Sequence, residues 1–235
     1  MIIPAAFHTA VTATGNTTPE DVNSKVLQIS RVTSILLIVS YAIYVFFQIR
    51  THESIYDTIF ENDYQKDKDK HKDVLKDKLT FTECVIALAV SIPLVTIIAI
   101  CLVEQIHYIV QTRHISDSFM GLILVPLVEK FAEHLTAIDE AWDNQMNMAL
   151  AHVLGATVQT SLFNAPLAVL VSWALGKHLD LNFSLFNVVV LILAILVVGN
   201  FLRDQKSNYL EGSLCFIVYI NIAVAAYHYP NPKAY

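Results

Sequence analysis

The sequence predicts an all-α, polytopic membrane protein with about six transmembrane helices. Of its 235 residues, 55% are hydrophobic and only 15% are charged, whereas soluble domains carry about a quarter charged residues. The mean hydropathy is +0.52. Six stretches are long and apolar enough to cross a bilayer core, which takes about 20 residues of helix.

The expected membrane helices follow one another closely after the first. They are residues 32–49, 82–110, 118–138, 148–175, 183–202 and 210–229. Short connections join the last five, so residues 82–229 are expected to form one membrane region with a tail at 230–235. Residues 1–31 are expected to hold the end of an apolar helix and a loop, because MIIPAAFHTAV lacks the basic start of a signal peptide. The chain is therefore expected to be a fragment or an unusually short relative of a longer protein.

Residues 50–81 form the one long polar stretch. Its start has the pattern of an amphipathic helix, with one side made of Ile55, Tyr56 and Ile59 and the other of Glu53, Asp57 and Glu61. Its second part alternates Lys with Asp, which favours a solvated, mobile linker. The alternative is that the whole stretch only adds solubility. Because the side with this loop is richer in Lys and Arg, the loop is predicted to be cytosolic and the C-terminus to lie across the membrane.

The composition argues against several classes of function. The net charge of −6 gives no basic surface for nucleic acid. The three cysteines, Cys84, Cys101 and Cys215, show no metal or disulfide spacing and are expected to pack as small apolar residues. The His134-x4-Asp139 spacing fits a membrane acyltransferase, but no Gly/Pro-rich acceptor motif follows it. We therefore do not expect an enzyme.

The stretch 118–138 carries a cluster of ionisable residues directly after the apolar run GLILVPLV: Glu129, Lys130, Glu133 and His134. Such side chains at membrane depth normally face a protein interior or a wet cavity. Pro126, seven residues before Glu133, removes a backbone hydrogen bond and is expected to break the helix.

A buried carboxylate is neutralised either by a proton or by a bound cation, so Glu133 has the chemistry of a proton-coupled cation exchanger. The alternative places the cluster at the end of a span. Lys130 would then form an interfacial salt bridge, and Asp139, Glu140 and Asp143 would belong to a wet loop.

The stretch 148–175 supplies polar partners. Thr157 and Gln159 bring a hydroxyl and an amide to membrane depth, and Pro166 lies seven residues after Gln159 as a second expected helix break. Oxygen donors suit hard cations, so Glu133 and Gln159 are candidate Ca²⁺ ligands. His134 and His152 are expected to pack or relay protons, and no zinc site is predicted.

The segment GLILVPLVEKFAEHLTAIDEAWDNQMNMALAHVLGATVQTSLFNAPLAVLVSW resembles the second signature repeat of the cation/proton exchangers, the Ca²⁺/H⁺ antiporters of fungal and plant vacuoles in the sodium/calcium exchanger superfamily. That repeat reads approximately G-L-I-x-x-P-x-x-G-N-A-A-E-H, then G-S-S-x-Q-x-x-L-F. The resemblance implies that 1–50 end the first half and that 82–229 are a five-helix repeat with broken helices at the ion site. It also implies that 50–81 occupy the place of the acidic cytosolic helix thought to be regulatory.

The resemblance also implies roles for single residues. Glu133 matches the essential carboxylate of the family and His134 the histidine beside it, while Thr157 and Gln159 match polar residues of the partner helix. Glu129 and Lys130 replace the usual Gly-Asn pair. Lys130 is therefore expected to modulate the site, because it can hold Glu133 ionised and occupy the place of a cation.

The expected function is Ca²⁺/H⁺ exchange across the vacuolar membrane, with no cofactor besides the transported ions. The expected partners are membrane lipid, the cation and protons, and either a first exchanger repeat or further copies of the chain. Two alternatives stay open: a monovalent cation/H⁺ antiporter, and a non-transporting scaffold or regulatory half-exchanger in which Lys130 locks Glu133 in a salt bridge.

Overall fold

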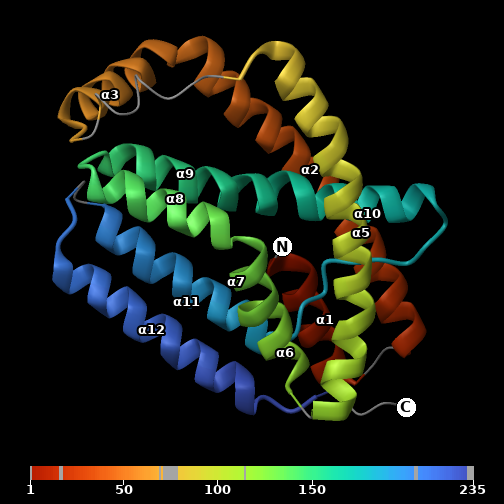
Figure 1. The fold of residues 1–235 in the computed structure, drawn as a ribbon. Helices are drawn as coiled ribbons and strands as arrows, with labels where there is room; N and C mark the ends of the chain where they lie inside the picture. Colours follow the sequence, from red (N-terminus) through yellow and green to blue (C-terminus); the bar gives the residue numbers. More distant parts are fainter. Residues whose placement is uncertain are drawn as a thin grey trace. The chain divides into compact units, whose positions relative to one another are not determined.

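A computed structural model gives the fold (Figure 1) and describes residues 2–15, 18–68, 70, 79–113, 115–203 and 206–231. Side chains are described for all of these except His107 and Gln111. Every regular element in the described ranges is helical, which confirms the all-α prediction. Five helical stretches there are long and apolar enough to cross a membrane: Pro19–Thr51, Phe81–Val110, Met146–Ala174, Leu185–Leu202 and Tyr209–His228.

The sixth predicted span, 118–138, is not one continuous helix. It consists of α6 (Asp117–Phe119), the π-helical turn η2 (Met120–Leu124), α7 (Val125–Glu129) and α8 (Phe131–Trp142). Lys130 separates α7 from α8 with non-helical dihedral angles, φ −96° and ψ 10°. The helix is therefore interrupted, as predicted for this stretch, and the interruption lies at Lys130.

The chain divides into two compact units, which we describe separately. Unit 1 comprises Met1–Lys68 and Ala132–Gly199, and unit 2 comprises Asp69–Phe131 and Asn200–Tyr235. Besides most of α8, unit 1 contains α1 (Ile2–Thr14), α2 (Pro19–Phe46), η1 (Phe47–Thr51), α3 (Glu53–Lys66), α9 (Met146–Gln159), η3 (Thr160–Asn164), α10 (Ala165–Ala174) and α11 (Leu185–Leu202). Besides α6, η2 and α7, unit 2 contains α5 (Phe81–Arg113) and α12 (Tyr209–His228).

In unit 1, α2 packs against α1, α10 and η3. Its buried residues, Val22, Val26, Ser30 and Ser34, recur every four positions and so share one face. The two serines are fully buried, and small residues let neighbouring helices approach closely inside a membrane. Ser30 Oγ also accepts a hydrogen bond of 3.0 Å from the backbone N–H of Leu181, which ties the segment after α10 to α2.

The start of α2 differs from the prediction. The helix begins at Pro19, well before the apolar stretch predicted at 32–49, because Thr18 caps it and proline at the first position needs no hydrogen-bond partner. Thr18 Oγ1 accepts a bond from Asp21 N at 3.4 Å. Most of the segment predicted as helix end and loop, 1–31, is therefore helical, in α1 and in the first turns of α2.

The polar stretch 50–81 contains a helix, as its pattern predicts, but of the predicted apolar side only Tyr56 lies on the buried face. Asp63 is buried, and Tyr56 and Phe60, on the same side of α3, are half-buried. Ile55 and Ile59 are instead 54% and 38% exposed. The Lys/Asp alternation predicted as a mobile linker lies largely outside the described residues, as does most of the tail at 230–235.

In unit 2, side-chain hydrogen bonds cap the starts of α5 and α6. The start of α5 is a reciprocal capping box, in which Glu83 Oε2 accepts bonds from Thr80 N at 2.7 Å and Thr80 Oγ1 at 2.9 Å. Beyond α12, Asn231 Oδ1 accepts a bond from Asp117 N at 2.6 Å, so the chain after the last helix caps the first turn of α6. The rings of Phe119 and Tyr227 meet edge to face with centroids 5.4 Å apart.

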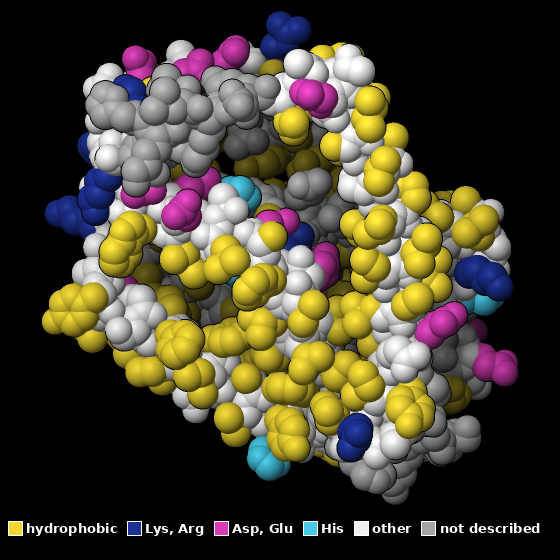
Figure 2. Space-filling model, in the orientation of Figure 1, with side chains coloured by type: hydrophobic (Ala, Val, Ile, Leu, Met, Phe, Trp, Pro, Cys, Tyr) yellow, Lys and Arg dark blue, Asp and Glu magenta, His cyan; other side chains and the backbone are white. Residues whose placement is uncertain are grey.

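Large hydrophobic side chains are exposed along the long helices. Figure 2 shows such side chains on the visible side of α5 and on the visible side of α12. On α5 they include Ile92, Ile97 and Val103, each at least 60% exposed. Lipid is as apolar as these side chains, so a membrane helix loses nothing by presenting them outward.

Candidate functional site

The candidate site lies on the hairpin of α8 and α9 in unit 1. A tight turn joins the two helices, and Asn144 in that turn has a positive φ of 67°. The turn closes the end of α8, since Asp143 N donates to Asp139 O at 3.0 Å and Gln145 N donates to Glu140 O at 2.9 Å. The two helices therefore run antiparallel and side by side (Figure 1).

One side-chain contact fixes the register of this hairpin. His152 Nδ1 of α9 lies 3.4 Å from Glu140 Oε1 of α8. Glu133 is seven residues before Glu140, and Gln159 is seven residues after His152. Seven residues of helix advance about 10.5 Å and return to nearly the same face. Extended along regular helices, this register sets Glu133 and Gln159 at the same level of the hairpin.

The other predicted ligands of the hairpin do not lie on the helix faces of Glu133 and Gln159. Thr157 is two residues from Gln159, which is about 200° around a helix axis, and its hydroxyl donates to Val153 O in its own helix at 2.9 Å. His134 is one residue from Glu133, about 100° around α8, and is exposed. Of the four predicted ion-binding residues, Glu133 and Gln159 are thus the two that share a level and a helix face by this register.

Glu133 is half-buried and Gln159 is exposed within this chain. Thr157 Oγ1 is a donor to its own helix but keeps lone pairs with which it can accept. A half-buried carboxylate on an apolar helix pair has the chemistry that proton or cation exchange needs. The described residues contain no group of three or more His, Cys, Asp or Glu side chains placed to hold a metal ion.

The contact that Glu140 makes with α9 was not predicted from the sequence. The alternative interpretation placed it in a wet loop with Asp139 and Asp143, but Glu140 belongs to α8 and its side chain is only 20% exposed. Its second oxygen, Oε2, is buried with no hydrogen-bond partner among the described residues. The equal spacings of 133–140 and 152–159 in the sequence carry the signal that pairs the two helices.

Both predicted helix breaks are π-helical turns that precede a proline. The η2 turn closes with Val125 N donating to Met120 O, and Pro126 follows. The η3 turn closes with Ala165 N donating to Thr160 O, and Pro166 follows. Proline has no N–H and its ring clashes with the carbonyl four residues earlier, and the wider turn relieves that clash.

The interruption of the polar segment itself lies at Lys130, not at Pro126. Pro126 stands in the first turn of α7, where a missing N–H is tolerated, and α7 ends at Glu129. Lys130 Nζ lies 3.9 Å from Glu129 Oε1, and the two side chains are 31% and 64% exposed. An ion pair this long and this exposed contributes little to stability.

Comparisons with known proteins point to one family. A profile of the family described as sodium/calcium exchanger protein matches residues 84–228. The chain is 29% identical over 233 residues to the vacuolar calcium ion transporter of Schizosaccharomyces pombe, covering 98% of this chain and 53% of that protein. It is 36% identical over 198 residues to vacuolar cation/proton exchanger 1b of Oryza sativa subsp. japonica, covering 84% and 44%.

A bacterial relative and a solved structure extend these matches. The Ca(2+)/H(+) antiporter of Aphanothece halophytica is 36% identical over 129 residues, which cover 55% of this chain and 35% of that protein. The solved structure titled "Structure of native YfkE" superposes with a TM-score of 0.68 at 23% identity, covering 96% of this chain and 60% of the other, and so shares its fold. The chain spans about half the length of the curated relatives it matches.

Proposed function

Because the chain belongs to the sodium/calcium exchanger family, we propose that it works in a proton-coupled cation antiporter that exchanges Ca²⁺ for H⁺ across the vacuolar membrane. The observation that supports the proposal most is the His152–Glu140 contact of the hairpin, because helical periodicity extends it to a shared level for Glu133 and Gln159. The printed names of the relatives, vacuolar calcium ion transporter and vacuolar cation/proton exchanger, supply the cation and the membrane.

Glu133 is the group that binds either a proton or the transported cation. With a proton bound it is neutral and releases the cation, and with the proton gone it is an anion that attracts one. Gln159 adds a neutral amide oxygen, which suits a hard cation such as Ca²⁺. Alternate exposure of this pair to the cytosol and to an acidic lumen lets luminal protons displace the bound cation. The residues 50–81 then face the cytosol and the C-terminus the lumen.

The hairpin alone does not complete a calcium site. Ca²⁺ takes about six to eight oxygen ligands, and the register brings together one carboxylate and one amide from this chain. The missing ligands would come from a first exchanger repeat or from a second copy of the chain, with water filling the remaining positions.

The test is Ca²⁺ uptake into vesicles that contain the reconstituted protein and an acidic interior. Glu133→Gln keeps the size of the side chain and removes the charge, so we expect uptake driven by the pH gradient to be lost. The matched control is Asp139→Asn on the exposed side of α8, which should keep wild-type uptake. Uptake by Glu133→Gln equal to that of the wild type would refute the role of this carboxylate.

The position of Lys130 favours a second candidate, a half-exchanger that does not transport. Lys130 stands at the helix interruption three residues before Glu133 and carries a fixed positive charge. If that charge takes the place of the cation, Lys130→Asn will give uptake where the wild type gives none. Uptake of external Na⁺ or K⁺ by the same vesicles, in place of Ca²⁺, would identify a monovalent cation antiporter.

A further inference from the structure

Helix α3 is fastened to the turn end of the α8–α9 hairpin by a buried carboxylate. Asp63 is only 1% exposed. Its Oδ2 accepts hydrogen bonds from Asn147 N at 2.8 Å and from Met148 N at 3.1 Å, and its Oδ1 accepts one from Asn147 Nδ2 at 2.9 Å. All of these atoms belong to unit 1. The bonds join parts of the chain that are 84 residues apart.

Asp63 thereby does for α9 what a local capping residue usually does. The first N–H groups of a helix have no partner inside it, and they form the positive end of the helix dipole. Gln145, the residue at the N-cap position of α9, makes no side-chain cap hydrogen bond. The cap comes from another helix, so the start of α9 and the position of α3 depend on the same three bonds.

A lysine just beyond α3 holds the other side of the turn. Lys68 Nζ donates to the carbonyl oxygen of Trp142, the last residue of α8, at 3.0 Å. The same ammonium lies 6.0 Å from the centroid of the Trp142 ring. The last carbonyls of a helix are the negative end of its dipole. Residues 53–68 therefore present an acid to the start of α9 and a base to the end of α8.

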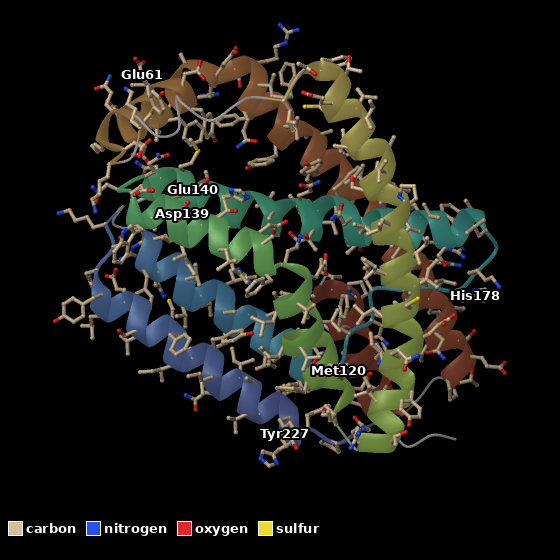
Figure 3. The ribbon with its side chains drawn as sticks, in the orientation of Figure 1. Glu61, Met120, Asp139, Glu140, His178 and Tyr227 are labelled. Carbon is tan, nitrogen blue, oxygen red and sulfur yellow. The ribbon has the colours of Figure 1, made fainter. Side chains whose placement is uncertain are left out.

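The fit is specific to one acid of α3. Asp63 is buried, while Glu53, Asp57 and Glu61 are exposed, with Glu61 labelled in Figure 3. A helix of 14 residues, as α3 is, is marginal in water without tertiary contacts. The order of α3 therefore depends on its packing against α9, where Asp63 makes the hydrogen bonds.

We propose that residues 53–68 form a clamp on the α8–α9 turn and that Asp63 is a positioning residue for the pair Glu133 and Gln159. The clamp grips α8 and α9 separately, and so it sets how far one helix slides along the other. A slide by one residue is about 1.5 Å, which is more than an ion–oxygen distance tolerates. The ion-binding part of this inference rests on the proposed function, whereas the clamp itself does not.

Hydrogen exchange in the reconstituted full chain tests the clamp without any transport. Asp63→Ala should speed exchange at least tenfold for the amides of Asn147 and Met148 and throughout α3. The matched control Glu61→Gln also removes one negative charge from α3 and should leave exchange unchanged. Equal protection in wild type and Asp63→Ala would overturn the clamp.

A second variant separates clamping from simple helix capping. Adding Gln145→Asp to Asp63→Ala gives α9 a local cap, so exchange at Asn147 and Met148 should return toward the wild-type rate while α3 stays released. In vesicles this double variant should still show a KM for Ca²⁺ raised several-fold. A wild-type KM with α3 released would overturn the positioning role. Absence of uptake by the wild type would instead contradict the proposed function. The hydrogen-exchange result would then be the test of the clamp.

Discussion

At the scale of single residues, the contact between Glu140 and His152 has the widest consequence. It is the contact that sets α8 and α9 level with each other, and from it Glu133 and Gln159 follow by equal steps of seven residues. Among the described residues Glu140 Oε2 is buried without a hydrogen-bond partner, so this oxygen retains a desolvation cost that an added donor would offset. Within the described residues, Glu140 therefore contacts His152 through one oxygen and leaves the other without a hydrogen bond, two turns from Glu133.

The register makes a prediction that needs no transport. In a chain whose three cysteines are replaced by alanine, Glu133→Cys with Gln159→Cys should be linked by a short bifunctional thiol reagent. Glu133→Cys with Thr157→Cys should be linked at least several-fold more slowly, because Thr157 lies about 200° around α9 from Gln159. Peptide mass spectrometry measures both yields. Equal yields would show that the two helices are not in this register.

Spacing in the sequence relates some residues of the candidate site to one another, whereas other residues are related only by contacts distant in sequence. The i, i+7 relations around Glu133 and Gln159 are visible in the sequence because helical periodicity turns spacing into a shared face. Asp63 could not be found in this way. Its partners lie 84 residues away, and on α3 it looks like any other acid in a charged stretch. Only the packed structure shows which of the four acids of α3 is buried.

At the scale of elements, prolines and caps account for where helices begin and bend. The sequence predicted breaks at Pro126 and Pro166, and each proline follows a π-helical turn. It did not predict the interruption at Lys130, since lysine has no intrinsic preference that ends a helix. It also did not predict that α2 begins at Pro19, because hydropathy alone locates the apolar part of a helix and not its polar first turns.

The capping box of α5 gives a prediction for that element. Thr80→Ala removes both side-chain bonds of Thr80, and loss of such a cap costs about 1 kcal/mol. The first turn should then open about fivefold more often. Cys84 reports this opening, since it lies in that turn and its backbone N–H donates to Thr80 O at 3.0 Å. Labelling of Cys84 by a maleimide should speed up accordingly.

Two controls make this measurement specific. Cys101, near the middle of α5, should react at an unchanged rate in the same protein, because a loosened cap frays only the nearest turn. Thr82→Ala, which leaves the Thr80–Glu83 bonds in place, should leave Cys84 at the wild-type rate. Faster labelling of both cysteines after Thr80→Ala would point to a general loss of fold and contradict a local cap.

At the scale of the whole molecule, the composition predicted a lipid environment and the fold class. The chain is 55% hydrophobic and 15% charged. In lipid, a backbone can satisfy its hydrogen-bonding groups only in helices or in a closed barrel. Long apolar runs without alternation select helices, and the described residues are helical throughout their regular elements. The five long helices carry many exposed hydrophobic side chains, which composition could not assign to lipid or to another protein surface.

The number of chains that make one site can be measured directly. The hairpin brings one carboxylate and one amide oxygen to a common level, far fewer than the oxygens Ca²⁺ requires. If two copies complete a site, mixing wild-type chains with Glu133→Gln chains should lower uptake as the square of the wild-type fraction. An equal mixture would then retain about a quarter of full uptake, because each site needs two intact copies. A linear fall to one half would show that each chain transports without a second copy and would contradict a shared site. Dilution of the wild type in lipid supplies the control, since uptake per chain should fall only where two chains must meet.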